Sequence, residues 1–162
     1  MEGKKNQWQE NRLVQMILIS HRGNVDGKKP HLENHTDYIN EALDLGYDVE
    51  IDVWFVDGKF MLGHDEPLYE TDYKFLMNEN LWVHAKNLDA LIELKKYAIH
   101  YFWHEEDTVT LTSKNYIWAY PGKQPIKGSI AVMPERSDDD VSQCKGICSD
   151  VIKKYKDEIT QA

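Results

Sequence analysis

The sequence predicts an α/β fold in which parallel strands form a reduced or distorted (β/α) barrel, with several crossover helices shortened or missing. Three observations lead to this prediction. Short apolar or alternating segments, typical of buried strands, recur along the chain. Between the first of them lie segments with helical spacing, as expected for parallel strands joined by right-handed crossovers. In the second half strand-like segments continue almost without helices, and 162 residues are too few for a full eight-fold barrel, which needs roughly 250.

The N-terminal part predicts a strand, a loop and a helix. Residues 1–12 read as a polar leader that is disordered or forms a short helix, and 13–162 as a single domain. Residues 16–20 (MILIS) form an apolar run of the kind found in strands that are buried on both faces. Residues 36–45 predict a helix, because Thr36 can cap its start and Gly46 can end it.

The most informative segment is 47–65. Residues 47–55 predict a strand, and 59–62 predict its hairpin partner across the turn Asp57-Gly58. Side chains two positions apart share a face of a strand. The first strand therefore has an acidic face and an apolar face, formed by Asp48, Glu50 and Asp52 and by Val49, Ile51 and Val53. Neighbouring carboxylates repel one another unless a cation or water compensates them, so the acidic face indicates a metal site.

The rest of the chain predicts one further helical unit and then mostly strands. Residues 66–80 read as a loop with at most a helical turn. A strand at 81–86 is followed by a helix from Asn87 to Tyr97, with an inner stripe of Leu88, Leu91 and Ile92. Further strands are expected at 99–103, 108–111, 116–119, 129–133 and 146–148, and a closing amphipathic helix at 151–159.

Composition excludes several classes of protein. A formal net charge of −9 argues against nonspecific nucleic-acid binding, which needs a basic surface. No segment approaches the ~20 apolar residues of a membrane helix, and the N-terminus lacks the apolar region of a signal peptide. We therefore expect a cytoplasmic protein. The two cysteines, Cys144 and Cys148, give no disulfide framework and are expected to be free, buried thiols.

Ionisable residues follow three successive predicted strands. His21 and Arg22 follow the first, Glu50 and Asp52 lie on the second, and His84 and Lys86 end the third. Each pair alone can be explained as a loop contact, a solvated face or a surface charge. If the strands are parallel neighbours, however, all six side chains converge at one end of the sheet. Such a cluster needs a ligand or an ion to balance it, and this indicates a functional site.

The same residues resemble the glycerophosphodiester phosphodiesterase family, within the phosphatidylinositol phospholipase C-like phosphodiesterase superfamily. The matching positions are His21-Arg22-Gly23, Glu33-Asn34, Ala42 with Gly46, Glu50-x-Asp52, Asp57-Gly58, His64-Asp65 and, in the last strand, Gly146 to Asp150. The match is dense over 17–65 and thin from 66 to 144. The chain therefore resembles a shortened member of the family.

The resemblance implies a fold, a reaction and a set of roles. The family is a TIM-like (β/α)₈ barrel that hydrolyses small glycerophosphodiesters with a divalent cation, through a cyclic phosphate. The ion here would be Mg, Ca, Mn or Zn. The acidic charge argues against nucleic acid as a partner, and together with the lack of an interfacial apolar segment it argues against stable membrane association. Carried over to this chain, the roles are metal ligation for Glu50 and Asp52, acid/base catalysis for His21 and His64, phosphate binding for Arg22 and Lys86, and support of the loop or substrate for Asn34.

Two departures from the family pattern leave alternatives open. His84 stands where the family has a third carboxylate, and imidazole favours Zn or Mn over Ca. Either His84 is the third ligand, or Glu135 or water completes the shell. The middle of the chain is also remodelled, and Trp103 and Trp118 there either pack in the core or line the pocket. The alternative functions are a phosphosugar- or phosphodiester-binding module without turnover and a lipid phosphodiesterase of the phospholipase C/D type.

Overall fold

The computed structural model describes residues 16–161, so the expected leader at 1–12 lies outside the described residues. The strands are β1 (Ile17–His21), β2 (Asp48–Val56), β3 (Lys59–Leu62), β4 (Tyr69–Thr71), β5 (Leu81–Ala85), β6 (Tyr101–Trp103), β7 (Val109–Leu111), β8 (Ile117–Ala119), β9 (Ile130–Val132) and β10 (Gly146–Ser149). The helices are α2 (Thr36–Asp44), α3 (Tyr73–Leu76), α4 (Leu88–Leu94), the 3₁₀ turn η1 (Pro134–Arg136) and α5 (Ile152–Gln161).

The protein is a mixed α/β protein built on one large, mostly parallel sheet of ten strands. β1 lies between β2 and β10, and β9 and β8 follow on the side of β10. β5 pairs with β2, and β6 pairs with β5. These pairings are all parallel, whereas β2–β3, β3–β4 and β7–β8 are antiparallel. The predicted α/β class, parallel core sheet and hairpin are thus confirmed.

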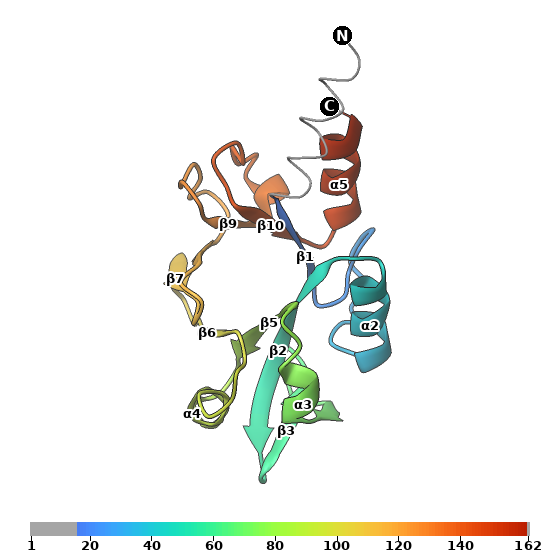
Figure 1. The fold of residues 1–162 in the computed structure, drawn as a ribbon, viewed down its shortest axis with the longest axis vertical. Coiled ribbons are helices and arrows are strands. Elements are labelled where there is room, and N and C mark those ends of the chain that lie inside the picture. Colours follow the sequence, from blue (N-terminus) through green and yellow to red (C-terminus); the bar gives the residue numbers. More distant parts are fainter. Residues whose placement is uncertain (1–15, 162) are drawn as a thin grey trace.

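The sheet curves strongly, but its ladders do not close into a barrel. In Figure 1 the strands surround a central region, with β6 and β7 on the side opposite β1. Within residues 16–161 no strand ladder joins β6 to β7 or β8. The two sides meet through isolated contacts, such as the hydrogen bond of 2.8 Å that Ser113 N donates to Tyr101 O.

The helices cover the sheet unevenly. α2 and α4 pack on β2, and α5 packs on β1 and β10. In Figure 1 β7 and β9 have no helix outside them. The predicted loss of helices from the second half is therefore confirmed for the described chain.

Alternate residues of the strands divide the apolar side chains into an inner and an outer core. The outer core lies between β2, β5 and the helices and includes Val49, Ile51 and Val53. The inner core lies on the concave side and contains residues from six strands, namely Ile19, Trp82, Phe102, Trp118, Ile130, Val132 and Cys148. The alternation predicted for 48–53 is therefore confirmed, because the acidic residues of β2 lie on the face opposite its apolar ones.

Several local predictions need correction. The side chain of His35 accepts from Asp37 N and caps α2, so Thr36 is the first helical residue and not the cap. Residues 66–80 contain the expected helical turn, α3, but also the strand β4, which was not predicted. α4 ends at Leu94. Of its expected inner stripe, Leu91 packs against the outer core, but Leu88 and Ile92 are 61% and 52% exposed, and Ala90 and Leu94 are buried instead.

The cause of the altered α4 face is its capping residue. Asn87 Nδ2 donates to Phe55 O at 3.0 Å, and its Oδ1 accepts from Phe55 N as well as Ala90 N. These bonds attach the start of the helix to β2 and set its rotation. Ala90 and Leu94, four positions apart, then face the sheet.

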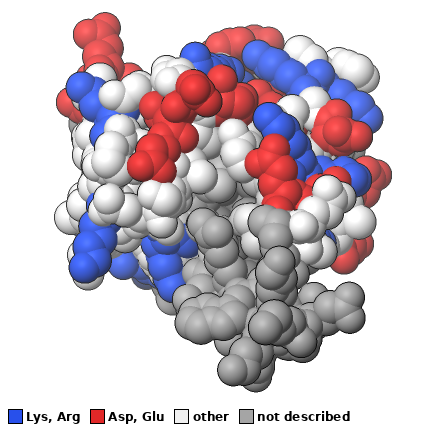
Figure 2. All heavy atoms as spheres, turned by 90° about the horizontal axis from the view of Figure 1, so that it is seen from above, with Lys and Arg blue, Asp and Glu red and all other residues white. Residues whose placement is uncertain are grey.

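The surface and the cysteines agree with the composition. Basic and acidic side chains lie intermixed on the face shown in Figure 2. No helix within residues 16–161 is long and apolar enough to cross a membrane. Both cysteines are free, as expected; Cys148 is buried, whereas Cys144 is only partly buried.

Candidate functional site

The strand register brings the predicted residues together on the concave face. On β1 and β2, His21 is the register partner of Glu50, and on β2 and β5, Asp52 is the partner of His84. Register partners on neighbouring parallel strands lie side by side. Glu50, Asp52 and His84 are 3%, 0% and 7% exposed, which makes them a buried polar group beside an apolar core.

The loop after β1 needs unusual backbone conformations to hold its side chains in place. Arg22 and Asn34 have φ of 58° and 63°, in the left-handed region. Arg22 N donates to Glu50 O at 2.8 Å, and Asn34 N donates to Arg22 O at 3.0 Å. Gly23 must be glycine, since a Cβ there would lie 2.6 Å from Cδ1 of Tyr38. These contacts turn the chain so that His21 and Arg22 both line the cavities described below.

Asp52 is a fully buried carboxylate with several polar groups around it. Asn34 Nδ2 donates to its Oδ2 at 2.9 Å, and Arg22 Nε lies 3.0 Å from the same atom. Burial alone would raise the pKa of Asp52, but the neighbouring imidazoles of His64 and His84 and the charge of Arg22 hold it well below its ordinary value. Asp52 is therefore an anion, and Asn34 supports the loop, one of its two expected roles.

Glu50 has the opposite electrostatic situation. Burial, followed by the charge of Asp52, raises the pKa of Glu50 well above its ordinary value. Its Oε2 is buried and has no hydrogen-bond partner among the described residues, with His21 Nε2 the nearest ionisable atom at 3.6 Å. The charges of Arg22 and Lys86 oppose this rise only in part, and a further positive charge beside the carboxylate would lower its pKa.

His84 is oriented by a main-chain carbonyl. Its Nε2 lies 3.1 Å from His104 O, which can only accept, so Nε2 carries a proton. Its Nδ1 then faces Asp52 Oδ1 at 3.1 Å and Glu50 Oε1 at 4.0 Å. Either Nδ1 carries a second proton or a cation lies between the ring and the carboxylates.

The residues present fit a divalent cation. Donor atoms of Glu50, Asp52 and His84 all lie within 4.8 Å of one another. A cation there would compensate the buried carboxylates of Glu50 and Asp52 and accept the Nδ1 lone pair of His84, which faces Glu50 Oε1. The bond of Nε2 to a backbone carbonyl is the usual support of a metal-binding histidine. One imidazole with two carboxylates suits Zn or Mn better than Ca.

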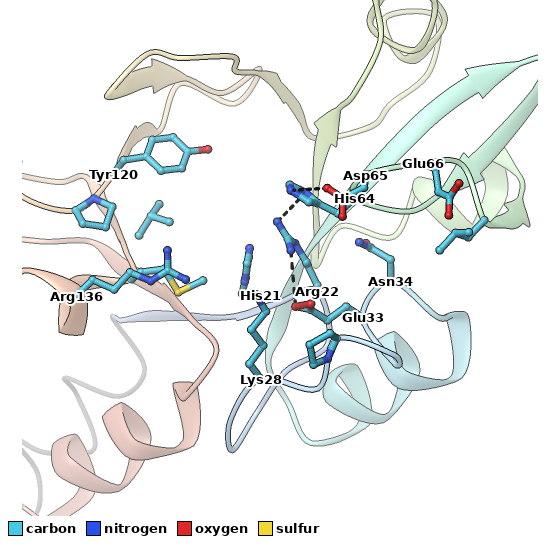
Figure 3. A pocket seen from close by; sticks show the side chains of 15 residues that line it. His21, Arg22, Lys28, Glu33, Asn34, His64, Asp65, Glu66, Tyr120 and Arg136 are labelled. Atoms are coloured by element: carbon cyan, nitrogen blue, oxygen red, sulfur yellow. Dashed lines mark hydrogen bonds and ion pairs between the residues drawn. The ribbon is translucent and has the colours of Figure 1, made fainter.

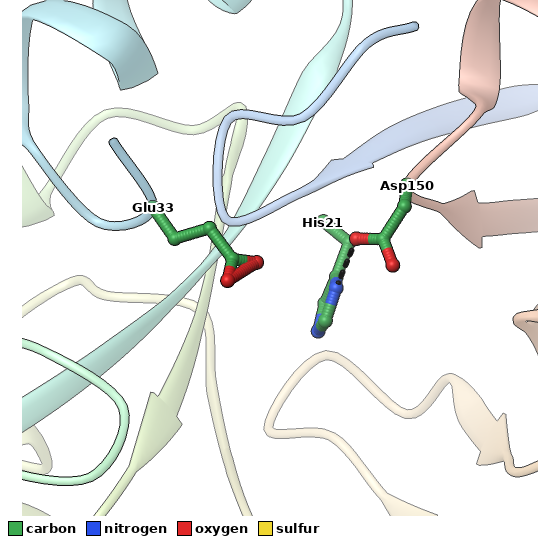
Figure 4. A group of neighbouring side chains, drawn as sticks. All are labelled: His21, Glu33 and Asp150. Atoms are coloured by element: carbon green, nitrogen blue, oxygen red, sulfur yellow. Dashed lines mark hydrogen bonds and ion pairs between the residues drawn. The ribbon is translucent and has the colours of Figure 1, made fainter. Parts of the chain in front are cut away.

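A second buried group could also hold a metal: His21, Glu33 and Asp150 (Figure 4). Each of its three side chains already has a hydrogen-bond partner within the protein. His21 Nδ1 lies 2.7 Å from Asp150 Oδ1, and Asn24 Nδ2 donates to Glu33 Oε2 at 2.8 Å and to Asp150 Oδ1 at 2.9 Å. Burial alone would raise the pKa of Asp150, but the hydrogen bond and charge of His21 lower it. This group therefore orients His21 by itself.

His21 consequently exposes one nitrogen to the cavity. The ionised Asp150 can only accept, so Nδ1 of His21 carries the proton and Nε2 has the free lone pair. Burial lowers the pKa of His21, which favours the neutral ring. A base oriented by a carboxylate is the arrangement found in many hydrolytic sites.

His64 contacts both basic residues. Arg22 Nη2 donates to its Nδ1 at 2.7 Å, so the proton of a neutral His64 lies on Nε2, which is 3.6 Å from Asp65 Oδ1. Lys86 Nζ lies 3.5 Å from the same Nδ1. Lys86 therefore stands behind His64 and is absent from the walls of the two cavities described next.

Two joined cavities open above these groups. The outer cleft, of about 560 Å³, is lined by His21, Arg22, Asn34 and His64 and reaches Tyr120 and Arg136 on the far side (Figure 3). The inner cavity, of about 130 Å³, shares His21, Arg22, His64 and Tyr120 with it and reaches Glu50, His84, His104 and Trp118. The expected convergence of His21 and His64 on one cavity is confirmed.

Three alternatives left by the sequence are now decided. Glu135 accepts from Ser149 Oγ at 2.8 Å and Tyr155 OH at 3.0 Å, so it belongs to the α5 side and does not complete the shell. Trp103 packs against the outer core. Trp118, only 1% exposed, packs in the inner core and also lines the inner cavity.

Sequence reasoning missed four residues of the site: Asn24, His104, Arg136 and the role of Asp150. Asp150 belongs to the last-strand motif, so a signal for it existed. Asn24, His104 and Arg136 lie in segments whose path no local pattern reveals.

Comparison of the chain with known protein families, with curated proteins and with solved structures finds no match.

Proposed function

We propose that this protein hydrolyses a glycerophosphodiester-like phosphodiester at the outer cleft, as a reduced member of the glycerophosphodiester phosphodiesterase family. The observation that carries the proposal is the junction of a carboxylate-oriented histidine, His21, with a buried cation site. Both stand at one end of a parallel sheet, where barrel enzymes have their catalytic groups. The chain order of the neighbouring parallel strands, β1-β2-β5-β6 and β8-β9-β10-β1, supports a reduced TIM-like barrel as the architecture.

Each residue has a proposed task. His21 Nε2 takes the proton of the attacking hydroxyl, and Asp150 keeps the ring in the required tautomer. When Arg22 turns to the phosphate, His64 Nδ1 is free to take up a proton from solvent, and the imidazolium then gives its Nε2 proton to the leaving oxygen and becomes neutral again. Each proton transfer contributes ~10²–10⁴ in rate. Arg22 supplies positive charge to the phosphate. Lys86 Nζ, which lies 3.5 Å from His64 Nδ1, places positive charge beside that ring. Glu50, Asp52 and His84 would hold the divalent cation, which when bound neutralises the nonbridging oxygens as charge develops.

The Glu50 group is the better of the two candidate metal sites. Its Oε2 has no partner among the described residues, whereas Asn24 donates to both carboxylates of the other group. The cation is proposed as Mn or Zn on the basis of the imidazole ligand.

One observation favours a second candidate, a phosphodiester-binding module without turnover. Arg22 occupies Nδ1 of His64, so that ring has no free lone pair in this arrangement. A bound phosphate competes for Arg22, and turnover requires that competition to release His64. The two candidates differ in whether product forms.

The test is hydrolysis of bis-p-nitrophenyl phosphate and of glycerophosphodiesters with Mg, Ca, Mn or Zn. We expect His21→Ala and Glu50→Gln to lower kcat at least 10²-fold, because each removes a group used in the transition state. The exposed His31→Ala is the matched control and keeps full activity. Chelation is expected to abolish turnover and Mn or Zn to restore it.

Activity within twofold of wild type in His21→Ala would contradict the assignment of the base. Full activity after exhaustive chelation would remove the cation from the scheme. Phosphate binding without turnover under every metal would support the binding module instead.

A further inference from the structure

We propose that a groove on the outer face of the sheet binds an alkylated ammonium group, that is, an ammonium nitrogen whose hydrogens are replaced by methyl groups. The groove lies at the end of the molecule that carries α3, α4 and the β2–β3 hairpin (Figure 1). Among the described residues it shares no wall residue with the outer cleft or the inner cavity. The inference therefore goes beyond the proposed function and does not depend on it.

The strand register gathers aromatic side chains in this groove. Phe55 on β2 is the register partner of Phe60 on β3, and the two rings meet edge to face with centroids 4.9 Å apart. Tyr97, which follows α4, has its ring centroid 6.2 Å from that of Phe60. Tyr73, at the start of α3, stacks on Tyr97 with centroids 4.8 Å apart. The four rings form one continuous series of contacts along a groove of about 220 Å³.

The angles between the rings suit a cation. A cation is attracted to the face of an aromatic ring within ~6 Å of its centroid, and quaternary ammonium ions are bound between several rings. The ring planes of Phe60 and Tyr97 are inclined by 69°, and those of Phe55 and Phe60 by 61°. Rings inclined in this way present their faces in different directions. Tyr73 is 40% exposed, so its ring is accessible to a ligand from solvent.

The charges of the wall have the sign that a cation needs. Three carboxylates line the groove, those of Glu70, Asp72 and Glu93, against one basic side chain, Lys59. Lys59 Nζ lies 3.1 Å from Glu70 Oε2, but both side chains are more than half exposed, and such a pair contributes little to stability. The side chain of Glu93 is only 18% exposed, and its Oε2 accepts from the exposed Lys96 at 2.7 Å. Even with Lys96 counted, the groove is negatively charged.

The wall distinguishes an alkylated ammonium from other cations. Within residues 16–161 its carboxylates do not form a group whose oxygens all lie within 4.8 Å of one another, as a hard metal ion requires. A primary ammonium is compact and strongly hydrated, and it needs oxygen acceptors for its three N–H groups. The methyl groups of an alkylated ammonium need no acceptors. Their surface packs on aromatic rings while the charge interacts with the carboxylates.

The test is a two-dimensional NMR titration of the protein with choline and with neohexanol, in which a tert-butyl group replaces the trimethylammonium group. We expect choline to bind about tenfold more tightly, because only the cation interacts with the ring faces and the carboxylates. The amide signals of residues 58–60, 70–73 and 93–97 are expected to shift.

A peptide that carries one trimethyllysine is a second source of the same group. The tighter of the two ammonium probes identifies whether the groove takes a free small molecule or a modified side chain. A preference of about tenfold over neohexanol by either probe supports the inference.

Two variants of the wall test its parts. Tyr73→Leu removes the accessible ring, and Glu93→Gln removes the least exposed charge with little change of shape. We expect each variant to weaken the binding of choline at least about fivefold. The matched controls keep the wild-type affinity: Tyr73→Phe retains the ring, and Glu158→Gln makes the same change at a glutamate on α5 that also pairs with a lysine, Lys154, at 3.8 Å. If Tyr73→Leu does not fold, Glu93→Gln decides.

Equal affinity for choline and neohexanol would overturn the inference, because the groove would then be merely apolar. Shifts confined to residues 21–23 and His64 would also overturn it, since the cation would then lie in the outer cleft. So would an affinity that Tyr73→Leu and Glu93→Gln leave unchanged, or the absence of any shift with both ammonium probes. Failure of the proposed function is a separate result: no diester is hydrolysed, yet the preference for the ammonium and its loss in the two variants are still observed.

Discussion

At the scale of single residues, Asn24 holds the His21 side of the site together. It is fully buried, and its amide uses both ends: Nδ2 donates to Glu33 and Asp150, and Oδ1 accepts from Tyr38 OH at 2.9 Å and Lys29 N at 3.1 Å. It is a shared donor between two carboxylates that would otherwise repel each other. The Asn24 main-chain N–H also donates to His21 O at 3.0 Å, so both its main chain and its side chain help to orient His21.

The variant Asn24→Asp tests this dependence. It replaces the shared donor with a third carboxylate, which pushes Asp150 away from His21. We expect kcat for a phosphodiester to fall about 10–100-fold with KM within twofold, the size of effect seen when an orienting residue is lost. The downfield Nδ1–H resonance of His21 should disappear from the proton NMR spectrum.

The exposed Asn40→Asp makes the same chemical change on the surface of α2 and serves as the control. Thermal unfolding of both variants separates a loss of fold from a loss of orientation. A resonance and a kcat unchanged in folded Asn24→Asp would show that Asp150 needs no support from Asn24.

At the scale of elements, the end of β3 shows how tightly the loop bearing His64 is built. Gly63 N donates to Asp52 O at 3.1 Å, and Gly63 O accepts from Trp54 Nε1 at 2.7 Å. A Cβ on Gly63 would lie 2.0 Å from Glu66 O, which is a backbone atom that cannot move alone. The position of His64 thus depends on a glycine immediately before it.

We expect Gly63→Ala to lower the free energy of unfolding by at least ~2 kcal/mol, because the 63–68 backbone must shift. Gly58→Ala is the matched control. It also has a positive φ, of 77°, but a Cβ there meets nothing within 4 Å, so only the conformational cost of ~1 kcal/mol applies. Urea unfolding measures both. Equal losses in the two variants would show that the 63–68 loop yields easily.

Elements also mark the limit of what the sequence predicts. Alternation located the acidic and apolar faces of β2, because the period of a strand leaves only two choices of face. The predicted inner face of α4 was wrong at Leu88 and Ile92. Asn87 attaches the start of the helix to Phe55, on a strand more than thirty residues earlier, and so sets its rotation. The contact between His84 Nε2 and His104 O was not predictable either, since it depends on the tertiary path of the chain after β6.

At the scale of the whole molecule, the curved sheet encloses a polar residue far from the candidate site. His100 is 4% exposed and stacks on Trp82 with centroids 4.2 Å apart. Its Nε2 lies 2.7 Å from Thr112 Oγ1, whose own acceptor capacity is used by Tyr116 N. Burial, followed by the charge of Lys114, lowers the pKa of His100 from 6.5 to about 4.

This burial predicts a loss of stability in acid. The unfolded chain binds a proton on His100 below pH 6.5, whereas the folded protein resists until about pH 4, so stability is lost as the pH falls through that range. The loss from this group approaches about 3 kcal/mol at pH 4. We expect His100→Gln to reduce the difference in unfolding free energy between pH 7 and pH 4, with the exposed His31→Gln as control. An unchanged difference in His100→Gln would contradict the interpretation.

At this scale the sequence predicted the convergence of the ionisable groups correctly, but it did not predict whether the sheet closes into a barrel. His21, Arg22, Glu50, Asp52 and His84 meet because parallel strands deliver the ends of successive segments to one side, which the sequence pattern implies. Whether β6 pairs with β7 depends on the short turns between residues 104 and 116, which carry no periodic signal. The inner cavity likewise results from the packing of Trp118 and Tyr120, which composition does not reveal.

The location of β10 between β1 and β9 has a consequence for how the molecule acquires its chemistry. His21 and Asp150 are 129 residues apart in sequence, yet they share a hydrogen bond. Closing so long a loop is slow compared with forming local hairpins or helices. The β2–β3 hairpin and the neighbouring helices can therefore form while His21 still lacks its hydrogen-bond partner Asp150. The contact that orients the His21 ring is thus expected to form late in folding, after the local hairpins and helices.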